Sequence, residues 1–283
     1  MKSSPLKFSV LLFFICGVVV ARAYAEMQIG AAKINVTPDF PVWLNGYAAR
    51  ASMATNTGLK LWAKALAIGS DAEGPALFMT VDNCGVSAEV TTAVAERLRK
   101  KANIPRERIV LCSTHTHAAP CITGVLPNLL SRPFTAEEQR GIDQYTAALI
   151  DKLEQVALSA LGARQSGTLS WAQGSADFAR NRRTTNGPTD HALPVIKAVD
   201  DRGRLVAVVA AYACHCTTLG GDYNQFHGDW AGEAGAAFEK GHPGTVALIS
   251  LGCGADANPS PRGTVQLARE HGAEIVSAID NLL

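Results

Sequence analysis

The sequence predicts an α/β protein whose core is a mixed β-sheet flanked by helices. Short apolar segments typical of buried strands alternate along the chain with longer segments that have the periodicity of amphipathic helices. Twenty-five glycines, spread over 283 residues, indicate the many turns that such an alternation needs. No linker or low-complexity tract divides residues 26–283, so we expect one domain.

The first part of the chain contains three predicted strands, at 27–36, 61–68 and 76–81. Thr37-Pro38 forms a turn that ends the first of them. Turn residues at 72–75 connect the second strand to the third like a hairpin, so we expect antiparallel pairing near the start of the sheet.

Two helices and one strand follow. Ser87 is a suitable N-cap for a helix at 88–101, and an apolar strand comes after it at 108–112. Thr135 and Glu138 have the spacing of a capping box at the start of a longer helix, 136–161. The apolar face of that helix consists of Ile142, Tyr145, Leu149, Leu153 and Val156.

The second half of the chain continues the alternation of strands and helices. Strands are predicted near 167–173, 194–199 and 204–213, followed by a helix at about 229–239, a strand at 245–251 and a last helix at about 263–282. The sequence contains no evident internal repeat.

The charge of the chain excludes some classes of partner. The formal net charge is +1, and neither a basic stripe nor an acidic run is present. Nucleic acid and charged membrane surfaces are therefore not expected as partners.

Residues 1–25 have the pattern of a secretory signal peptide. Lys2 and Lys7 give a positive start, residues 8–20 form an apolar run, and Ala23-Tyr24-Ala25 is a small-x-small cleavage site. The apolar run is too short to cross a bilayer. We therefore expect cleavage after Ala25 and a secreted or periplasmic product with no further membrane-spanning segment.

Six cysteines remain once Cys16 is removed with the signal peptide. They are Cys84, Cys112, Cys121, Cys214, Cys216 and Cys253. In an oxidising compartment they could form disulfides, whose connectivity a sequence does not give. Buried unpaired thiols are the alternative.

Residues capable of chemistry gather where predicted strands end. Four such segments stand out, at 82–83, 114–117, 214–220 and 252–259. Sites of α/β proteins lie at the carboxyl ends of strands. In extended geometry His115 and His117 point to the same side, about 6–7 Å apart, so both can line one cavity.

His215 ends a different strand from His115, and neighbouring strands could bring the two together. Neutral imidazole is a preferred zinc ligand, and a catalytic zinc usually has three protein ligands and one open position. One of the paired histidines could bind the metal while the other contacts substrate or moves a proton. Packing or surface histidines are the alternative interpretation.

Cys214 and Cys216 flank His215 but alternate with it, so their side chains are expected on the opposite face. We interpret them as buried thiols or disulfide partners and not as metal ligands.

Three further polar residues have two interpretations each. Asp229 is either an N-cap or part of a pocket wall, because it starts a predicted helix. Arg182 is either solvated or an anchor for a carbonyl or carboxylate of a ligand. Asn258 lies in a turn by composition, and its place after a buried strand makes it a site candidate.

In order and spacing, these motifs resemble the catalytic domain of the neutral/alkaline (non-lysosomal) ceramidase family. The resemblance covers nearly all of residues 26–283. The segment Thr114-His115-Thr116-His117, taken together with the other matching segments, is specific for this family. The matching segments are 29–38, 45–47, 61–66, 80–82, 113–117, 181–182, 214–220, 229–232 and 256–259.

The resemblance implies a ceramidase-like zinc hydrolase domain, an amidase that cleaves the N-acyl bond of a ceramide-like lipid or a small-molecule amide. It implies Zn²⁺ as cofactor, with His115 and His215 as ligands, His117 beside the metal and Arg182 in the active site. This chemistry is coherent, because zinc activates water and polarises the amide carbonyl while His and Arg side chains stabilise the oxyanion.

The sequence departs from the family at two points. Where the family has a serine implicated in catalysis, this chain has Asn258, so hydrolysis would rely on metal-activated water, and Asn258 could donate a hydrogen bond to the oxyanion. The family also implies a Glu and a Tyr ligand, which we expect beyond Leu283. The alternatives are a non-catalytic ligand-binding relative and a metallohydrolase of a small non-lipid amide or ester.

Overall fold

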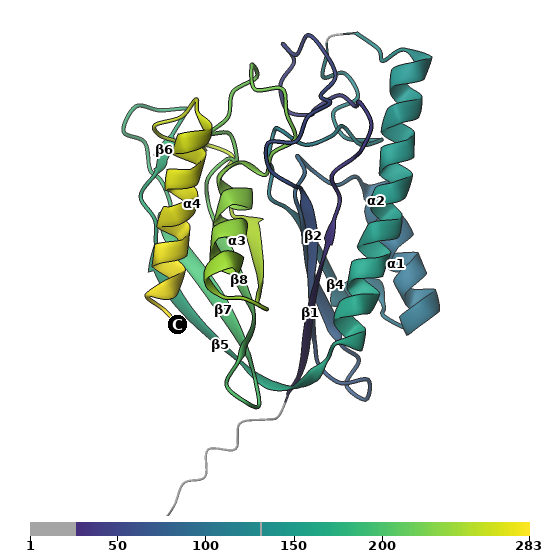
Figure 1. Cartoon of the computed structure of the whole chain (residues 1–283), viewed down its shortest axis with the longest axis vertical. Helices are drawn as coiled ribbons and strands as arrows, with labels where there is room; N and C mark the ends of the chain where they lie inside the picture. The colour runs from purple at the N-terminus through teal and green to yellow at the C-terminus, as the bar shows by residue number, and fades with distance from the viewer. Residues whose placement is uncertain (1–26, 131) are drawn as a thin grey trace, which may run out of the picture.

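A computed structural model describes residues 27–130 and 132–283 (Figure 1). The predicted signal peptide, 1–25, lies outside the described residues. The core is one eight-stranded mixed sheet, which confirms the predicted fold class. In sheet order the strands are β4 (Ile109–Ser113), β3 (Ala76–Val81), β2 (Trp62–Ile68), β1 (Met27–Asn35), β5 (Gln165–Ser175), β7 (Ala192–Asp200), β8 (Leu205–Tyr212) and β9 (Val246–Leu251).

Four helices accompany the sheet, together with the 3₁₀ turn η1 (Arg106–Arg108). They are α1 (Ala88–Ala102), α2 (Ala136–Gly162), α3 (Asp229–Gly241) and α4 (Val265–Asp280). The Ser87 hydroxyl caps α1 by accepting from the backbone N–H of Val90, and Thr135 with Glu138 completes a capping box on α2, as predicted. In the described ranges, no helix has both the length and the apolar composition needed to cross a membrane.

The order of elements repeats along the chain, although the sequence shows no repeat. Among the helices and the strands of the eight-stranded sheet, the first half runs β1, β2, β3, α1, β4, α2, and the second runs β5, β7, β8, α3, β9, α4. In each half the first three strands pair antiparallel and the last two pair parallel. The repetition therefore lies in the topology and not in the sequence.

The two halves are joined in the sheet by a short pairing at one end. Residues 27–29 of β1 pair antiparallel with residues 165–167 of β5, and both strands begin there. Because the strands diverge beyond these three pairs, the halves form a V and extend in the same direction (Figure 1). As a result β3, β4, β8 and β9 all end at the open end of the V.

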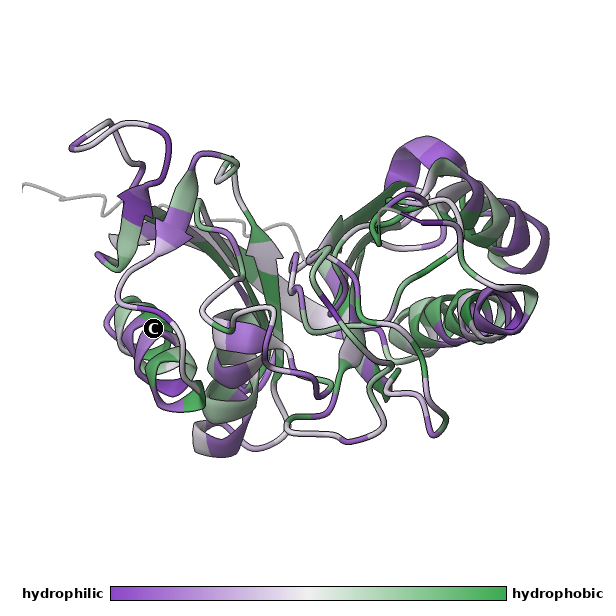
Figure 2. Cartoon of the chain, turned by 90° about the horizontal axis from the view of Figure 1, so that it is seen from above, coloured by the Kyte–Doolittle hydropathy of each residue, from purple (hydrophilic) through white to green (hydrophobic). Residues whose placement is uncertain are grey.

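Three apolar clusters stabilise this arrangement. Helices α1 and α2 pack on the first half of the sheet, and α3 and α4 pack on the second, so that the helix pairs flank the molecule (Figure 2). The third cluster fills the inside of the V, where Ile29 and Leu66 of the first half meet Ala207, Val209 and Leu248 of the second. Strand β9 thereby contacts β2, β3 and β4, from which it is distant in the sheet order.

A second sheet, which the sequence analysis missed, consists of β6 (Ala179–Asn181) and β10 (Ala257–Pro259). Residues 254–259 were expected to form a turn and not a strand. The pairing places Ala257 over the end of β8, where its carbonyl accepts from the backbone N–H of His215 at 2.9 Å.

Candidate functional site

Three histidines from two chain segments meet at the open end of the V. His115 and His117 follow β4, and His215 follows β8. The ring centroids of His115 and His215 are 4.7 Å apart, those of His115 and His117 4.8 Å, and those of His117 and His215 6.0 Å. We call these three residues the histidine cluster.

The local backbone differs from the predicted extended geometry. Strand β4 ends at Ser113, and His115 has a φ of +65°, in the left-handed region that few residues other than glycine adopt. The hydroxyl of Thr116 donates to the carbonyl of His227 at 2.7 Å and holds the turn in place. The expected strand alternation was therefore wrong, and a turn brings Nε2 of His115 within 3.3 Å of Nε2 of His117.

Hydrogen bonds set the tautomers of two histidines. Nδ1 of His115 lies 2.5 Å from the carbonyl oxygen of Cys84, and Nδ1 of His215 lies 2.8 Å from that of Gly254. Since a carbonyl only accepts, each Nδ1 carries the hydrogen and each Nε2 keeps its lone pair. This is the arrangement found around metal-binding imidazoles, so His115 and His215 fit a zinc ion as ligands.

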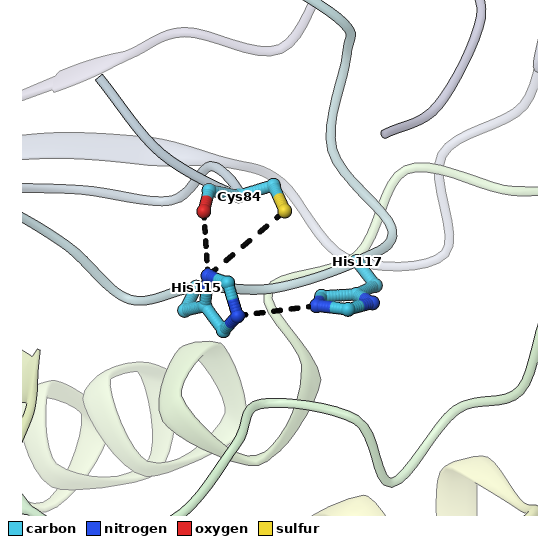
Figure 3. Close-up of side chains that lie close together, drawn as sticks. All are labelled: Cys84, His115 and His117. Atoms are coloured by element: carbon cyan, nitrogen blue, oxygen red, sulfur yellow. Dashed lines mark hydrogen bonds between the residues drawn. The ribbon is translucent and has the colours of Figure 1, made fainter. Parts of the chain in front are cut away.

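Cys84 completes a second possible group with His115 and His117, whose ligand atoms all lie within 4.8 Å of one another (Figure 3). Its sulfur faces Nδ1 of His115 at 3.9 Å, but that nitrogen already donates to the Cys84 carbonyl. Burial raises the pKa of the Cys84 thiol to about 12, which keeps it protonated. Cys84 is a further candidate ligand beside His115 and His117. Sequence reasoning missed it, although it directly follows the strand end at 82–83.

Two members of the histidine cluster, His117 and His215, are neutral near pH 7. Burial, together with the neighbouring His115, His215, Arg50 and Arg182, lowers the pKa of His117 to about 3. Burial also lowers the pKa of His215. Neutral imidazoles can bind a metal or accept a proton without first losing one.

The β6–β10 pair positions the two other predicted site residues. The backbone N–H of Arg182 donates to Asp256 at 2.7 Å, and its Nε donates to the carbonyl of Ala255 at 2.9 Å. The side-chain oxygen of Asn258 accepts from the Thr217 hydroxyl at 3.4 Å. Arg182 directly follows β6 and Asn258 lies in β10. The exposed Arg182 contributes to the lowered pKa of His117 and of His215.

Asp229 has a different role from the N-cap considered for it, because the N-cap of α3 is Gly228. One oxygen of the buried Asp229 carboxylate accepts from the backbone N–H groups of Thr218 at 3.0 Å and Trp230 at 2.7 Å, and the other accepts from that of Leu219 at 2.8 Å. It therefore anchors the segment that follows His215.

The cysteines beside His215 do not join the cluster. Cys214 and Cys216 are fully buried, and their thiols point to the carbonyls of His215 and Gly228. Burial raises the pKa of both thiols. Within the described residues all six cysteines are free, which agrees with the interpretation as unpaired thiols.

Comparison with known proteins identifies the family. Residues 27–250 match the family described as neutral/alkaline non-lysosomal ceramidase, N-terminal. The chain belongs to the neutral/alkaline non-lysosomal ceramidase family. The resemblance drawn from the sequence motifs is thereby confirmed.

Ceramidases are also found among its relatives and structural neighbours. A neutral ceramidase of Oryza sativa subsp. japonica is 23% identical over 269 residues, which are 85% of this chain and 33% of that protein. Two solved structures, a ceramidase complexed with C2 and the neutral ceramidase from Pseudomonas aeruginosa, are 19% and 20% identical, each with a TM-score of 0.77. They match 90% of this chain, which spans 43% and 44% of their lengths. At these identities, the structural matches show a shared fold.

Proposed function

We propose that this chain carries the histidine part of a zinc-dependent amide hydrolase centre. The observation that supports this most is the matched hydrogen bonding of His115 and His215. Each ring donates Nδ1–H to a backbone carbonyl and keeps an Nε2 lone pair, while the two ring centroids lie 4.7 Å apart. His191 also has its Nδ1 at a backbone carbonyl, that of Ala176, so it is the meeting of two such rings that supports a shared metal ion.

In the proposed reaction His115 and His215 would hold the zinc ion, which would supply Lewis acidity toward the amide carbonyl and acidify water. His117, neutral and adjacent to His115, takes a proton from the attacking water and returns it to the amine nitrogen as the C–N bond breaks. Arg182 and Asn258 present N–H donors to the developing oxyanion. Asn258 has no nucleophilic group, so water is the attacking species.

The proposed substrate is an N-acyl amide of the ceramide type. Family membership supports this class, as do the relatives, which are named neutral ceramidases. Hydrolysis would give a fatty acid and an amine with a long apolar chain. The chain spans less than half of those solved relatives, so ceramide turnover by these residues is itself part of the proposal.

Metal content tests the proposal directly. Purified residues 26–283 should bind about one zinc per chain, and His115→Ala or His215→Ala should each weaken zinc binding by at least about tenfold, since a ligand is lost. Mass spectrometry of the metal and titration against a chromophoric chelator measure this. His191→Ala is the matched control, because His191 hydrogen-bonds Ala176 outside the cluster and should leave zinc binding unchanged.

Turnover then separates the substrate classes. A short-chain fluorescent ceramide and a set of N-acyl amino acids would be compared with the zinc-loaded protein. Cleavage of the ceramide supports the proposal, and cleavage of the N-acyl amino acids alone points to a hydrolase of small amides. Zinc bound without turnover of either substrate points to a ligand-binding relative, and unchanged zinc in both histidine variants contradicts a metal site here.

We also propose that the protein is exported. The support is the pattern of residues 1–25, with Lys2, Lys7, an apolar run at 8–20 and the Ala23-Tyr24-Ala25 cleavage site. Expression of the full chain in a bacterium should give a product outside the cytoplasm that begins at Glu26. N-terminal sequencing of the periplasmic and medium fractions checks this, and an intact Met1 in all fractions would contradict export.

A further inference from the structure

A buried arginine outside the histidine cluster forms an unusual set of contacts. Arg50 lies in the loop between β1 and β2 and is only 7% exposed. Nη2 of its guanidinium donates to the carbonyl of His117 at 2.7 Å. Nη1 donates to the carbonyls of Tyr223 at 2.8 Å and Gly221 at 3.3 Å. The charged group is thus held by backbone carbonyls of two separate segments.

Burying a charge costs free energy that a well-packed apolar side chain would not. Burial indeed lowers the pKa of Arg50 below its ordinary value. An apolar side chain could not replace the guanidinium, because the donors of its planar fork reach two chain segments at once. Arg50 therefore acts as a clamp between the turn at His117 and the loop at 219–223.

The clamped loop is continuous with the segment that carries His215. The Asp229 carboxylate anchors Leu219 through its backbone N–H, and the hydroxyl of Tyr47 donates to the carbonyl of the same residue at 2.9 Å. The ring of Tyr47 meets the ring of His117 edge-on, with centroids 4.9 Å apart, and the Arg50 guanidinium lies 5.5 Å from the centre of the Tyr47 ring. Arg50 and Tyr47 thus join the His117 side of the cluster to the His215 side.

We infer that Arg50 is a positioning residue for the histidine cluster, acting through the main chain of His117 and of residues 219–223. The inference rests on the proposed metal-dependent function, because the distance between the two histidine segments matters most when one ion must be held by both. Residues that orient metal ligands without touching the metal typically contribute about 10–100-fold to metal affinity or activity.

Two substitutions test the clamp. Arg50→Met removes the charge and all three hydrogen bonds, and should weaken zinc binding by about tenfold and lower kcat with little change in KM. Arg50→Lys keeps the charge, but an ammonium on a single stem cannot replace the planar fork, so it should recover only part of the loss. Zinc affinity is measured by chelator competition, and kcat and KM with the fluorescent amide.

Arg164→Met is the matched control. Arg164 also donates to two backbone carbonyls, those of Leu161 at 2.8 Å and Gly69 at 2.9 Å, and its side chain is 15% exposed. It lies at the closed end of the V, just before β5 begins. The Arg164→Met variant should lower the melting temperature by a few degrees, because the hydrogen bonds of the arginine are lost. It should leave zinc affinity within about twofold of the wild-type value.

The outcomes separate this inference from the proposed function. Wild-type zinc affinity and kcat in folded Arg50→Met overturn the inference alone. So does an equal loss in Arg164→Met, which would mark a general effect of stability, or full recovery in Arg50→Lys, which would mark an effect of charge. A wild-type protein that binds no zinc overturns the proposed function and this inference with it.

Discussion

A single buried carboxylate, Asp82, shows how one residue can set the response of the protein to pH. It directly follows β3, beside a small cavity lined by Lys64, Thr80 and Thr114. It is 6% exposed and accepts from the backbone N–H of Trp62 at 2.8 Å. Burial raises its pKa to about 6, even though Lys64 and the hydrogen bond from Trp62 act in the other direction.

This shift predicts that Asp82 reduces stability as the pH rises. An unfolded aspartate has a pKa of about 3.9, so the folded state holds the extra proton between about pH 4 and 6. The stabilising contribution is fully present below pH 4 and is lost as the pH rises through 6. A shift of about two units corresponds to roughly 3 kcal/mol at most.

Asp82→Asn should remove this dependence, because the amide keeps an acceptor for Trp62 and carries no charge. Urea unfolding at pH 4, 5, 6 and 7 measures the free energy of both proteins. The wild type should lose stability relative to Asp82→Asn by about 2–3 kcal/mol over this range. If the free energies of unfolding of the two proteins instead change in parallel from pH 4 to 7, Asp82 stays ionised over this range.

At the level of elements, the long helix α2 depends on its first turn. The hydroxyl of Thr135 accepts from the backbone N–H of Glu138 at 3.2 Å, and the Glu138 carboxylate accepts from the backbone N–H of Thr135 at 2.7 Å. The same carboxylate accepts from Trp43 and forms an ion pair with Arg132. This start of the helix is therefore connected to two other segments.

Thr135→Ala should destabilise the protein by about 1 kcal/mol, because one N–H group of the first turn loses its cap. Thr135→Ser is the matched control, since serine caps at least as well as threonine, and should lie within a few tenths of a kcal/mol of the wild type. Thermal and urea unfolding measure both variants. An equal loss in both would assign the effect to the threonine methyl group and not to the cap.

Elements with local signals could be predicted from the sequence, and those without could not. Ser87, Thr135 and the apolar face of α2 act within one helix, so their pattern is readable along the chain. Strands β6 and β10 have three residues each and owe their form to a partner 76 to 80 residues away. Similarly, the left-handed turn at His115 and the role of Asp229 depend on contacts with distant loops.

At the scale of the whole molecule, the V explains why the histidine cluster exists. In a flat sheet with this order of strands, β4 and β8 would run in opposite directions and end at opposite edges. The three-residue pairing between β1 and β5 lets both halves extend to one side, so His115 and His215 meet. The sequence marked both residues as strand ends, but their meeting depends on this geometry, as does the clamp by Arg50.

The inside of the V is also bridged by charge, which predicts an asymmetric response to mutation. Lys64 of β2 donates to Glu239 of α3 at 2.7 Å and to the carbonyl of Ala247 on β9 at 2.8 Å. The side chains of Lys64 and Glu239 are 9% and 10% exposed, whereas Lys33, the second partner of Glu239, is 37% exposed. The carboxylate of Glu239 therefore forms ion pairs with two lysines, the buried Lys64 and the exposed Lys33.

Glu239→Gln should cost about 3 kcal/mol or more, because it leaves the Lys64 ammonium buried with a carbonyl and an amide and without its ion-pair partner. Lys64→Met should cost less, since Glu239 keeps Lys33 and the backbone N–H of Ala247. The double variant should cost less than the sum, because it leaves no buried lysine without its carboxylate. Urea unfolding of the three variants gives the free energies, with Lys33→Met as the exposed control, expected below about 1 kcal/mol. A larger loss in Lys64→Met than in Glu239→Gln would mean that the lysine stem packing between the halves, and not the buried charge, stabilises the V.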